Sequence, residues 1–247
     1  MRKVLIIALF AVVMLCVFTS CSFGKTEESI TPEIVGEIAE NSQNCKVYIR
    51  ENDEYIPYFV ITNNYNNNTL LMREKPLEDK MPMNNKYKIN YYPDSDLDYY
   101  LNNSFINKFS NTMKDIIVNT KIEVTAYDTL NGSISKRETE FINRKIFLLS
   151  ASECGIRSTM ATEEGEKTEN IDKFISSDRQ WLRSAYLWNY DSFWVIGDEQ
   201  GSDRAENSLS VHPVFTIPFD TEVEQSEDVI DGEIVFILAS ENVFLKV

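Results

Sequence analysis

Few residues of this sequence could do chemistry, and their spacing matches no common catalytic motif. His212 is the only histidine among 247 residues, so a Ser-His-Asp triad would need it, and no Gly-x-Ser-x-Gly turn supplies a nucleophile. A His-Glu-x-x-His zinc motif is excluded because it needs two histidines. The eight glycines form no phosphate-binding loop, and the 39 acidic residues offer no glycosidase pair distinguishable by spacing.

Acidic residues cluster in two places that a divalent cation could use. The segment Asp94–Asp98 has alternating carboxylates, but Tyr99 and Phe105 stand where a calcium loop needs Gly and Glu. We therefore interpret it as a helix N-terminus with favourable early acids. The second zone, residues 220–233, lies in a stretch without Lys or Arg. It is predicted to be a solvated loop, with a weak Ca²⁺ site as the alternative and no other cofactor expected.

The N-terminus indicates export. Residues 1–3 are basic at two positions, and residues 4–18 carry no charge. This run is shorter than the about 20 residues of a membrane span and is typical of a signal peptide. Phe18-Thr19-Ser20-Cys21 resembles the lipobox of bacterial lipoproteins, which implies acylation of Cys21, for example with palmitate, and anchoring on the extracytoplasmic face of the cell membrane. The alternatives are a plain secretory signal and a retained transmembrane helix.

These features predict three segments: a lipoprotein signal peptide at 1–20, the lipidated Cys21 with an acidic tether at 21–44, and one domain at 45–247. In the tether, Thr31-Pro32-Glu33 is a good helix start, and the apolar stripe that follows either docks onto the domain or frays. Cys45 and Cys154 remain after lipidation. They form a disulfide in an oxidising compartment or stay separate thiols.

The domain pattern is one of short strands with one helical insert. The predicted strands are 46–50, 56–62, 69–73, 122–127, 145–150, 186–196, 210–217, 233–238 and 242–246. The asparagine-rich run 63–68 is predicted to be a hairpin tip. Apolar residues recur every three to four positions from Leu97 to Ile117, and Ser110 can cap a second segment, which predicts two short helices. The fold class is therefore α+β, a single domain of short, mainly antiparallel strands with two short helices.

Several motifs can be compared with a known family. They are, in chain order, Leu101-Asn102, Phe109-Ser110, residues 145–150 with Glu153, Trp181-Leu182-Arg183-Ser184 and Val211-His212-Pro213. Over roughly residues 56–217 they resemble a domain family of unknown function, numbered six-two-seven-three, of exported proteins of Gram-positive bacteria. This family usually has Val-Arg-Pro where the chain has Val211-His212-Pro213, which puts any role of that Arg in doubt.

The family in turn resembles the C-type-lectin-like fold of formylglycine-generating enzymes. That second resemblance implies a fold widely used for recognition. It does not imply catalysis, because Cys45 and Cys154 do not lie in a motif like the copper-binding cysteine pair of those enzymes. Fold alone does not license a function.

An aromatic segment is the best candidate for a recognition surface. Tyr186, Trp188 and Tyr190 alternate, so on a strand they would share one face, and Trp194 follows. Aromatic faces stack on sugar rings, but alternating aromatics also fill sheet cores, and the sequence leaves both interpretations open.

Two polar residues near aromatic or apolar positions carry similar alternatives. Arg183, beside Trp181, could hold a ligand carboxylate or pair with a core acid or carbonyls. His212 is a packed or edge residue, or a pH switch. The candidate ligand-binding residues are Trp181, Arg183, Tyr186, Trp188, Tyr190, Trp194 and His212.

The net charge of −15 disfavours nucleic-acid partners, because such a surface repels phosphate backbones. The sequence therefore predicts a membrane-anchored bacterial surface lipoprotein that binds an envelope or host ligand, a carbohydrate or a protein, without transforming it. The alternatives are an enzyme of unrecognised type and a structural or adhesion module that binds a protein.

Overall fold

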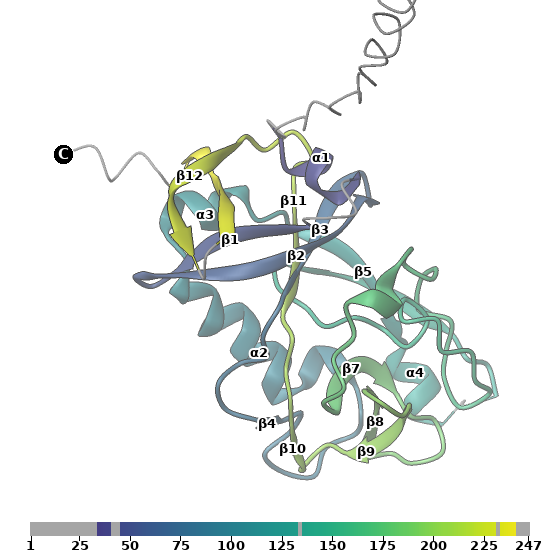
Figure 1. Ribbon diagram of the computed structural model, residues 1–247. Helices are drawn as coiled ribbons and strands as arrows, with labels where there is room; N and C mark the ends of the chain where they lie inside the picture. The colour runs from purple at the N-terminus through teal and green to yellow at the C-terminus, as the bar shows by residue number, and fades with distance from the viewer. Residues whose placement is uncertain (1–33, 41–44, 133–134, 231–232, 241–247) are drawn as a thin grey trace, which may run out of the picture. The chain divides into compact units, whose positions relative to one another are not determined.

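The computed structural model describes residues 34–40, 45–132, 135–230 and 233–240 (Figure 1). All of them belong to the unit Pro32–Val247. The predicted signal peptide, Cys21, most of the predicted tether and the predicted strand at 242–246 lie outside the described residues. Within the described part of the chain, no helix combines the length and the apolar character needed to cross a membrane.

A six-stranded sheet contains the first and the last of the described strands. Its strands, in spatial order, are β11 (Val214–Ile217), β3 (Asn68–Arg73), β2 (Glu54–Tyr65), β1 (Lys46–Glu51), β13 (Glu233–Leu238) and β12 (Val223–Ile230). Neighbouring strands pair antiparallel except β1 and β13, which are parallel. The N-terminal strand is thus held beside the C-terminal hairpin.

The β2–β3 hairpin confirms the predicted tip. Tyr65 pairs with Asn68, so Asn66 and Asn67 form a two-residue loop. Their φ angles are 51° and 61°. Both central residues of a type I′ turn need positive φ, and asparagine adopts it more readily than most residues. The asparagine-rich run therefore closes a tight hairpin.

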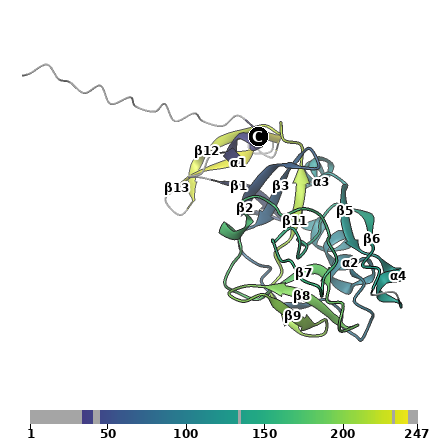
Figure 2. The same ribbon diagram turned by 90° about the vertical axis from the view of Figure 1, so that its right-hand side faces the viewer.

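Three smaller sheets complete the β structure, and Figure 2 shows the three strands of one of them side by side. The paired strands are β5 (Thr120–Thr125) with β6 (Thr139–Arg144), β4 (Met81–Pro82) with β10 (Ser208–Leu209), and β7 (Gln180–Ala185) with β8 (Ser192–Ile196) and β9 (Gly201–Arg204). All of these pairings are antiparallel. The described chain is therefore a β-rich domain with mostly antiparallel sheets.

The helices are short, and α2 and α3 begin at a serine cap. They are α1 (Val35–Glu40), η1 (Tyr92–Asp94), α2 (Asp96–Asn103), η2 (Phe105–Lys108), α3 (Asn111–Ile116), α4 (Tyr127–Leu130) and η3 (Ile171–Lys173). The hydroxyl of Ser95 accepts from the backbone N–H of Asp98 at 3.1 Å, and Ser110 accepts from Met113 at 3.0 Å. The prediction of two helices divided at Ser110, and of a helix N-terminus at the first acidic segment, is confirmed.

Helix α1 docks onto the domain. Val35 and Ile38 are fully buried in the main core. The backbone N–H of Val35 donates to Thr221 O at 2.9 Å, and that of Gly36 donates to Phe219 O at 3.0 Å. Because apolar burial and backbone hydrogen bonds act together, a helix too short to persist alone is held in place.

Several predicted strand boundaries are wrong. Residues 146–150 are buried, but the predicted strand 145–150 forms only one bridge, between Phe147 and Val214, because this run crosses from β6 to the main sheet. In the predicted strand 210–217, Val214–Ile217 form β11 and Ser210 makes an isolated bridge with Gln180. Pro213 lies between them and has no N–H to donate. The predicted acidic loop at 220–233 contains β12 instead, and an edge strand tolerates charged residues because one side stays unpaired.

Candidate functional site

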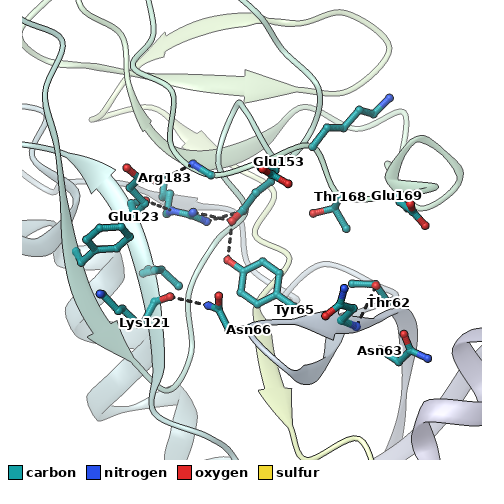
Figure 3. Close-up of a pocket in the computed structure, with 16 residues that line it drawn as sticks. Thr62, Asn63, Tyr65, Asn66, Lys121, Glu123, Glu153, Thr168, Glu169 and Arg183 are labelled. Atoms are coloured by element: carbon teal, nitrogen blue, oxygen red, sulfur yellow. Dashed lines mark hydrogen bonds and ion pairs between the residues drawn. The ribbon is translucent and has the colours of Figure 1, made fainter.

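A cavity of about 610 Å³ opens where segments distant in sequence meet (Figure 3). One wall is the β2–β3 hairpin at residues 62–66, the second is β5 at 121–123 with Phe141 of β6, and the third is the loop 165–169. Glu153 and Arg183 reach the floor. We call this cavity the groove. Its floor consists of Glu153, Arg183 and Tyr65.

The carboxylate of Glu153 has a full set of hydrogen-bond donors. Its Oε1 accepts from the hydroxyl of Tyr65 at 2.6 Å and from Nη2 of Arg183 at 2.8 Å. Its Oε2 accepts from Nη1 of Arg183 at 2.7 Å and from the backbone N–H of Ser150 at 2.8 Å. A carboxylate offers about four acceptor positions. Glu153 therefore holds the floor together, with its acceptor positions occupied by protein donors.

Local sequence places Glu153. The hydroxyl of Ser150 accepts from the backbone N–H of Glu153 at 3.0 Å, while Glu153 accepts from the N–H of Ser150. These reciprocal bonds are those of a capping box, Ser-x-x-Glu. The turn that follows is thereby fixed, and the carboxylate points toward Arg183.

Arg183 comes from β7 and is 1% exposed. Its Nε donates to Glu123 O at 2.9 Å, and Nη1 also donates to Leu148 O at 2.8 Å. Burial opposes its charge, but attraction to Glu153 and Tyr65 outweighs that and raises the pKa of Arg183. Burial, followed by the Glu153 charge, likewise raises the pKa of Tyr65. The guanidinium stays charged, and four of its five N–H groups donate to protein oxygens.

The β5–β6 wall presents Lys121, Glu123 and Phe141 on one face. Glu123 pairs in register with Phe141, and the Lys121 ammonium lies 4.1 Å from the centre of the phenyl ring. Asn66 at the hairpin tip donates to Lys121 O at 2.8 Å, which ties two walls together.

Backbone N–H groups of the third wall bond to the second wall and to the floor. Gly165 N–H donates to Oε2 of Glu123 at 3.0 Å, and Thr168 N–H donates to Glu153 O at 2.9 Å. Gly165 has a φ of +85°, a conformation that favours glycine. The groove is therefore held from all sides by contacts within the protein.

A second buried acid lies next to the floor. Glu164 accepts from the hydroxyls of Thr125 at 2.5 Å, Thr162 at 3.0 Å and Ser184 at 2.6 Å. Burial raises the pKa of Glu164, although Arg183 and these hydroxyls act in the opposite direction. Ser184 belongs to the same strand as Arg183, so β7 organises both acids.

Residues 66–219 match the family model of a domain of unknown function, DUF6273. This span is more than half of the 247 residues. The chain belongs to the DUF6273 family. The predicted resemblance over roughly residues 56–217 is confirmed, and the matched span contains the floor residues Glu153 and Arg183. No curated protein and no solved structure matches the chain.

Within the DUF6273 region, most of the predicted binding residues are buried. Trp181 is 2% exposed and its Nε1 donates to Met81 O at 2.8 Å. Trp194 is buried, donates to Met160 O at 3.2 Å and packs edge-on against the half-buried Tyr186. Of the seven predicted residues, Arg183 lines the groove, but its guanidinium forms an ion pair with Glu153.

The predicted strand 186–196 is confirmed only in its second half, which is β8, because residues 186–191 form a turn between β7 and β8. Ser192 N–H donates to Asn189 O at 3.2 Å, and the Asn90 side chain donates to three carbonyls around the turn, those of Tyr186, Asn189 and Ser192. Asn and Asp favour such turns. Trp188 and Tyr190 are 69% and 51% exposed there and do not line the groove. Their role in ligand binding stays a prediction.

His212 is buried in the DUF6273 region, as one of its two interpretations required. Its Nδ1 lies 3.1 Å from Arg73 O. Burial lowers the pKa of His212. Its use as a switch stays a prediction.

The structure holds Cys45 and Cys154 as free thiols, Cys154 buried and Cys45 half-buried. Their pairing in an oxidising compartment stays a prediction. In the first acidic segment, Asp96 pairs with Lys88 and Asp98 with Arg144. Among the described side chains, no three acidic, histidine or cysteine groups are arranged to hold a metal ion.

Sequence reasoning missed Tyr65, Lys121, Glu123 and Phe141 as groove residues. The Ser-x-x-Glu spacing at residues 150–153 is a signal that could have located the floor acid. No local signal marks the other four, because each is an ordinary strand residue until β2, β5 and β6 come together.

Proposed function

We propose that this chain is a lipid-anchored protein of the extracytoplasmic membrane face that binds an envelope or host ligand in the groove without transforming it. The observation that carries the proposal is that the charged groups of the floor are paired within the protein. Glu153 and Arg183 satisfy each other and the surrounding backbone, so the groove offers a rigid binding surface. The lipobox-like Phe18–Cys21 and the proposed C-type-lectin-like arrangement fit the same role.

Ligand binding is tested on the chain purified from membranes in detergent. Neutral glycan, peptide and anionic polymer fractions of bacterial envelopes are added in turn, and Tm is measured. A ligand at 100 times its Kd stabilises by about 2.7 kcal/mol, which is several degrees of Tm. Lys121→Ala should reduce the shift, whereas Lys80→Ala, an exposed lysine outside the groove, should not. Product analysis by mass that shows turnover would favour the enzyme alternative instead.

The anchor is tested separately. Cys21→Ala should abolish incorporation of an alkyne-labelled fatty acid and release the chain from membranes. Label retained at the wild-type level would contradict lipidation at this residue.

A second candidate is protein binding through the turn at residues 186–191. Trp188 and Tyr190 are the observation that favours it, because large exposed aromatic side chains are enriched at interfaces. Capture of a partner that is lost with Trp188→Ala and kept with Lys121→Ala would favour this surface over the groove.

A further inference from the structure

We propose that the ligand of the groove is an uncharged, hydroxyl-rich glycan that stacks on Phe141. This inference rests on the proposed function and names the substrate class of the same site. It follows from three properties of the lining: an exposed phenyl ring, charges of both signs, and a wall of amide and hydroxyl groups.

Phe141 is 60% exposed although it lies in the middle of β6. The opposite side of the β5–β6 ribbon carries Ile122 and Val124, which are buried in the core. Phe141 therefore contributes little to the core, and its ring is held beside Lys121. An aromatic face of this kind can pack against the C–H face of a sugar ring.

The charges around the groove disfavour a polyanion most, and they include one lysine, Lys121, that a polycation would meet. Lys121 and Lys167 line the same cavity as Glu123, Glu166 and Glu169. Lys167 pairs with Asp172 at 2.8 Å. A polyanion would meet Glu166 and Glu169, both exposed at the third wall, and a polycation would meet Lys121. The net charge of −15 adds to the repulsion of polyanions.

The remaining lining groups suit hydroxyls. Thr62, Asn64 and Asn66 supply hydroxyl and amide groups along the hairpin tip, and Thr168 lies across the groove. A sugar hydroxyl both donates and accepts, and amides and hydroxyls provide both functions. The volume lies within the range of about 300–1,000 Å³ for small-ligand sites.

A peptide ligand is less well matched. Peptide recognition uses apolar pockets for side chains or a free strand edge. Among the lining residues that the structure describes, Ile122 and Phe141 are the purely hydrocarbon side chains, and Ile122 is buried. The β5–β6 ribbon presents its face, not an edge, to the cavity.

The test is binding of the detergent-purified chain to an array of neutral and anionic oligosaccharides and envelope-derived peptides, followed by calorimetric titration of the binders. We expect a neutral oligosaccharide to bind. Phe141→Ala should weaken its Kd about tenfold, because an aromatic contact contributes about 0.5–1.5 kcal/mol beyond buried area. Phe141→Trp should keep the affinity. Trp188→Ala, an exposed aromatic outside the groove, is the matched control and should leave the Kd unchanged.

The outcomes separate this inference from the proposed function. Binding of a peptide or an anionic glycan that depends on Lys121, with no neutral glycan bound, would overturn the glycan inference and leave groove binding standing. Binding of a neutral glycan that depends on Trp188 and not on Phe141 would overturn the placement in the groove. If no arm of the array binds, both proposals fail. Because Phe141 is exposed, its variants should melt like the wild type, which excludes misfolding as the cause.

Discussion

The groove floor and the turn at residues 186–191 place opposite kinds of side chain in unexpected environments. At the floor, Arg183 and Glu153 are charged and buried, whereas at the turn Trp188 and Tyr190 are aromatic and mostly exposed. The floor charges are stable because each has hydrogen-bond partners from the backbone and from the other charge. The turn is held instead by its backbone, through the Asn90 side chain.

This difference teaches that residue type alone does not separate a binding surface from an internal support. The sequence leaves Arg183 as either a ligand-binding arginine or a partner of a core acid, and the structure pairs it with Glu153. Phe141 looks like a core residue, but β5–β6 pairing turns it outward. The role of each residue depends on the side chains and backbone groups that other strands place beside it.

The largest effect that would test the comparison is loss of the floor arginine. Arg183→Ala leaves Glu153 buried without its cation, and breaking one partner of a buried ion pair costs about 3–5 kcal/mol. Chemical denaturation measures this. The matched control is Arg157→Ala, because Arg157 is 57% exposed and lies 4.0 Å from Glu163; it should change stability by less than about 0.5 kcal/mol. Equal effects of the two variants would contradict a structural floor.

A pair of tryptophans tests the other half of the comparison. Trp181→Ala empties a core position and should cost about 3–5 kcal/mol. Trp188→Ala removes an exposed ring and should cost less than about 0.5 kcal/mol. Thermal and urea unfolding measure both. A large loss of stability in Trp188→Ala would show that the turn contributes to folding and is not simply a surface.

The pH dependence of stability tests the second buried acid, which lies next to the floor. Burial raises the pKa of Glu164 in the folded state, above about 4.3 in the unfolded chain. Its stabilising contribution is therefore fully present below pH of about 4.3 and is lost as pH rises through the folded pKa. Glutamine does not ionise, so Glu164→Gln does not lose stability in this way. The variant should therefore gain stability relative to the wild type as pH increases.

Urea unfolding from about pH 4 to about pH 8 measures the effect. Glu163→Gln is the neighbouring control, since the Glu163 side chain is 87% exposed, and its stability should run parallel to that of the wild type. A difference between Glu164→Gln and wild type that does not grow with pH would contradict the assignment.

The smallest effect concerns the order in which the two cysteines react, and no change in stability is expected. Burial raises the pKa of the Cys154 thiol, which slows its reaction because the thiolate is the nucleophile. In the native chain without reductant, Cys45 should be alkylated before Cys154, and unfolding should expose both, as measured by peptide mass. If neither is alkylated until a reductant is added, the two are bridged.

Local signals in the sequence determined much of the fold. The asparagine run sets the tight β2–β3 turn because asparagine tolerates positive φ. Ser95 and Ser110 start α2 and α3 because a hydroxyl accepts from a backbone N–H three residues on. The family motifs likewise identified the DUF6273 region. Each of these signals acts within a few residues, or as an ordered set of short motifs.

The tertiary structure alone decided the site. Tyr65 and Glu153 are 88 residues apart, and Arg183 and Glu153 are 30 apart. Hydrophobic periodicity reports which face of an element is buried, but it does not report which distant element covers that face. The partner of Arg183, the exposure of Phe141 and Trp188 and the existence of the groove therefore follow from how β2, β5 and β7 assemble, because burial and charge pairing are properties of the packed chain.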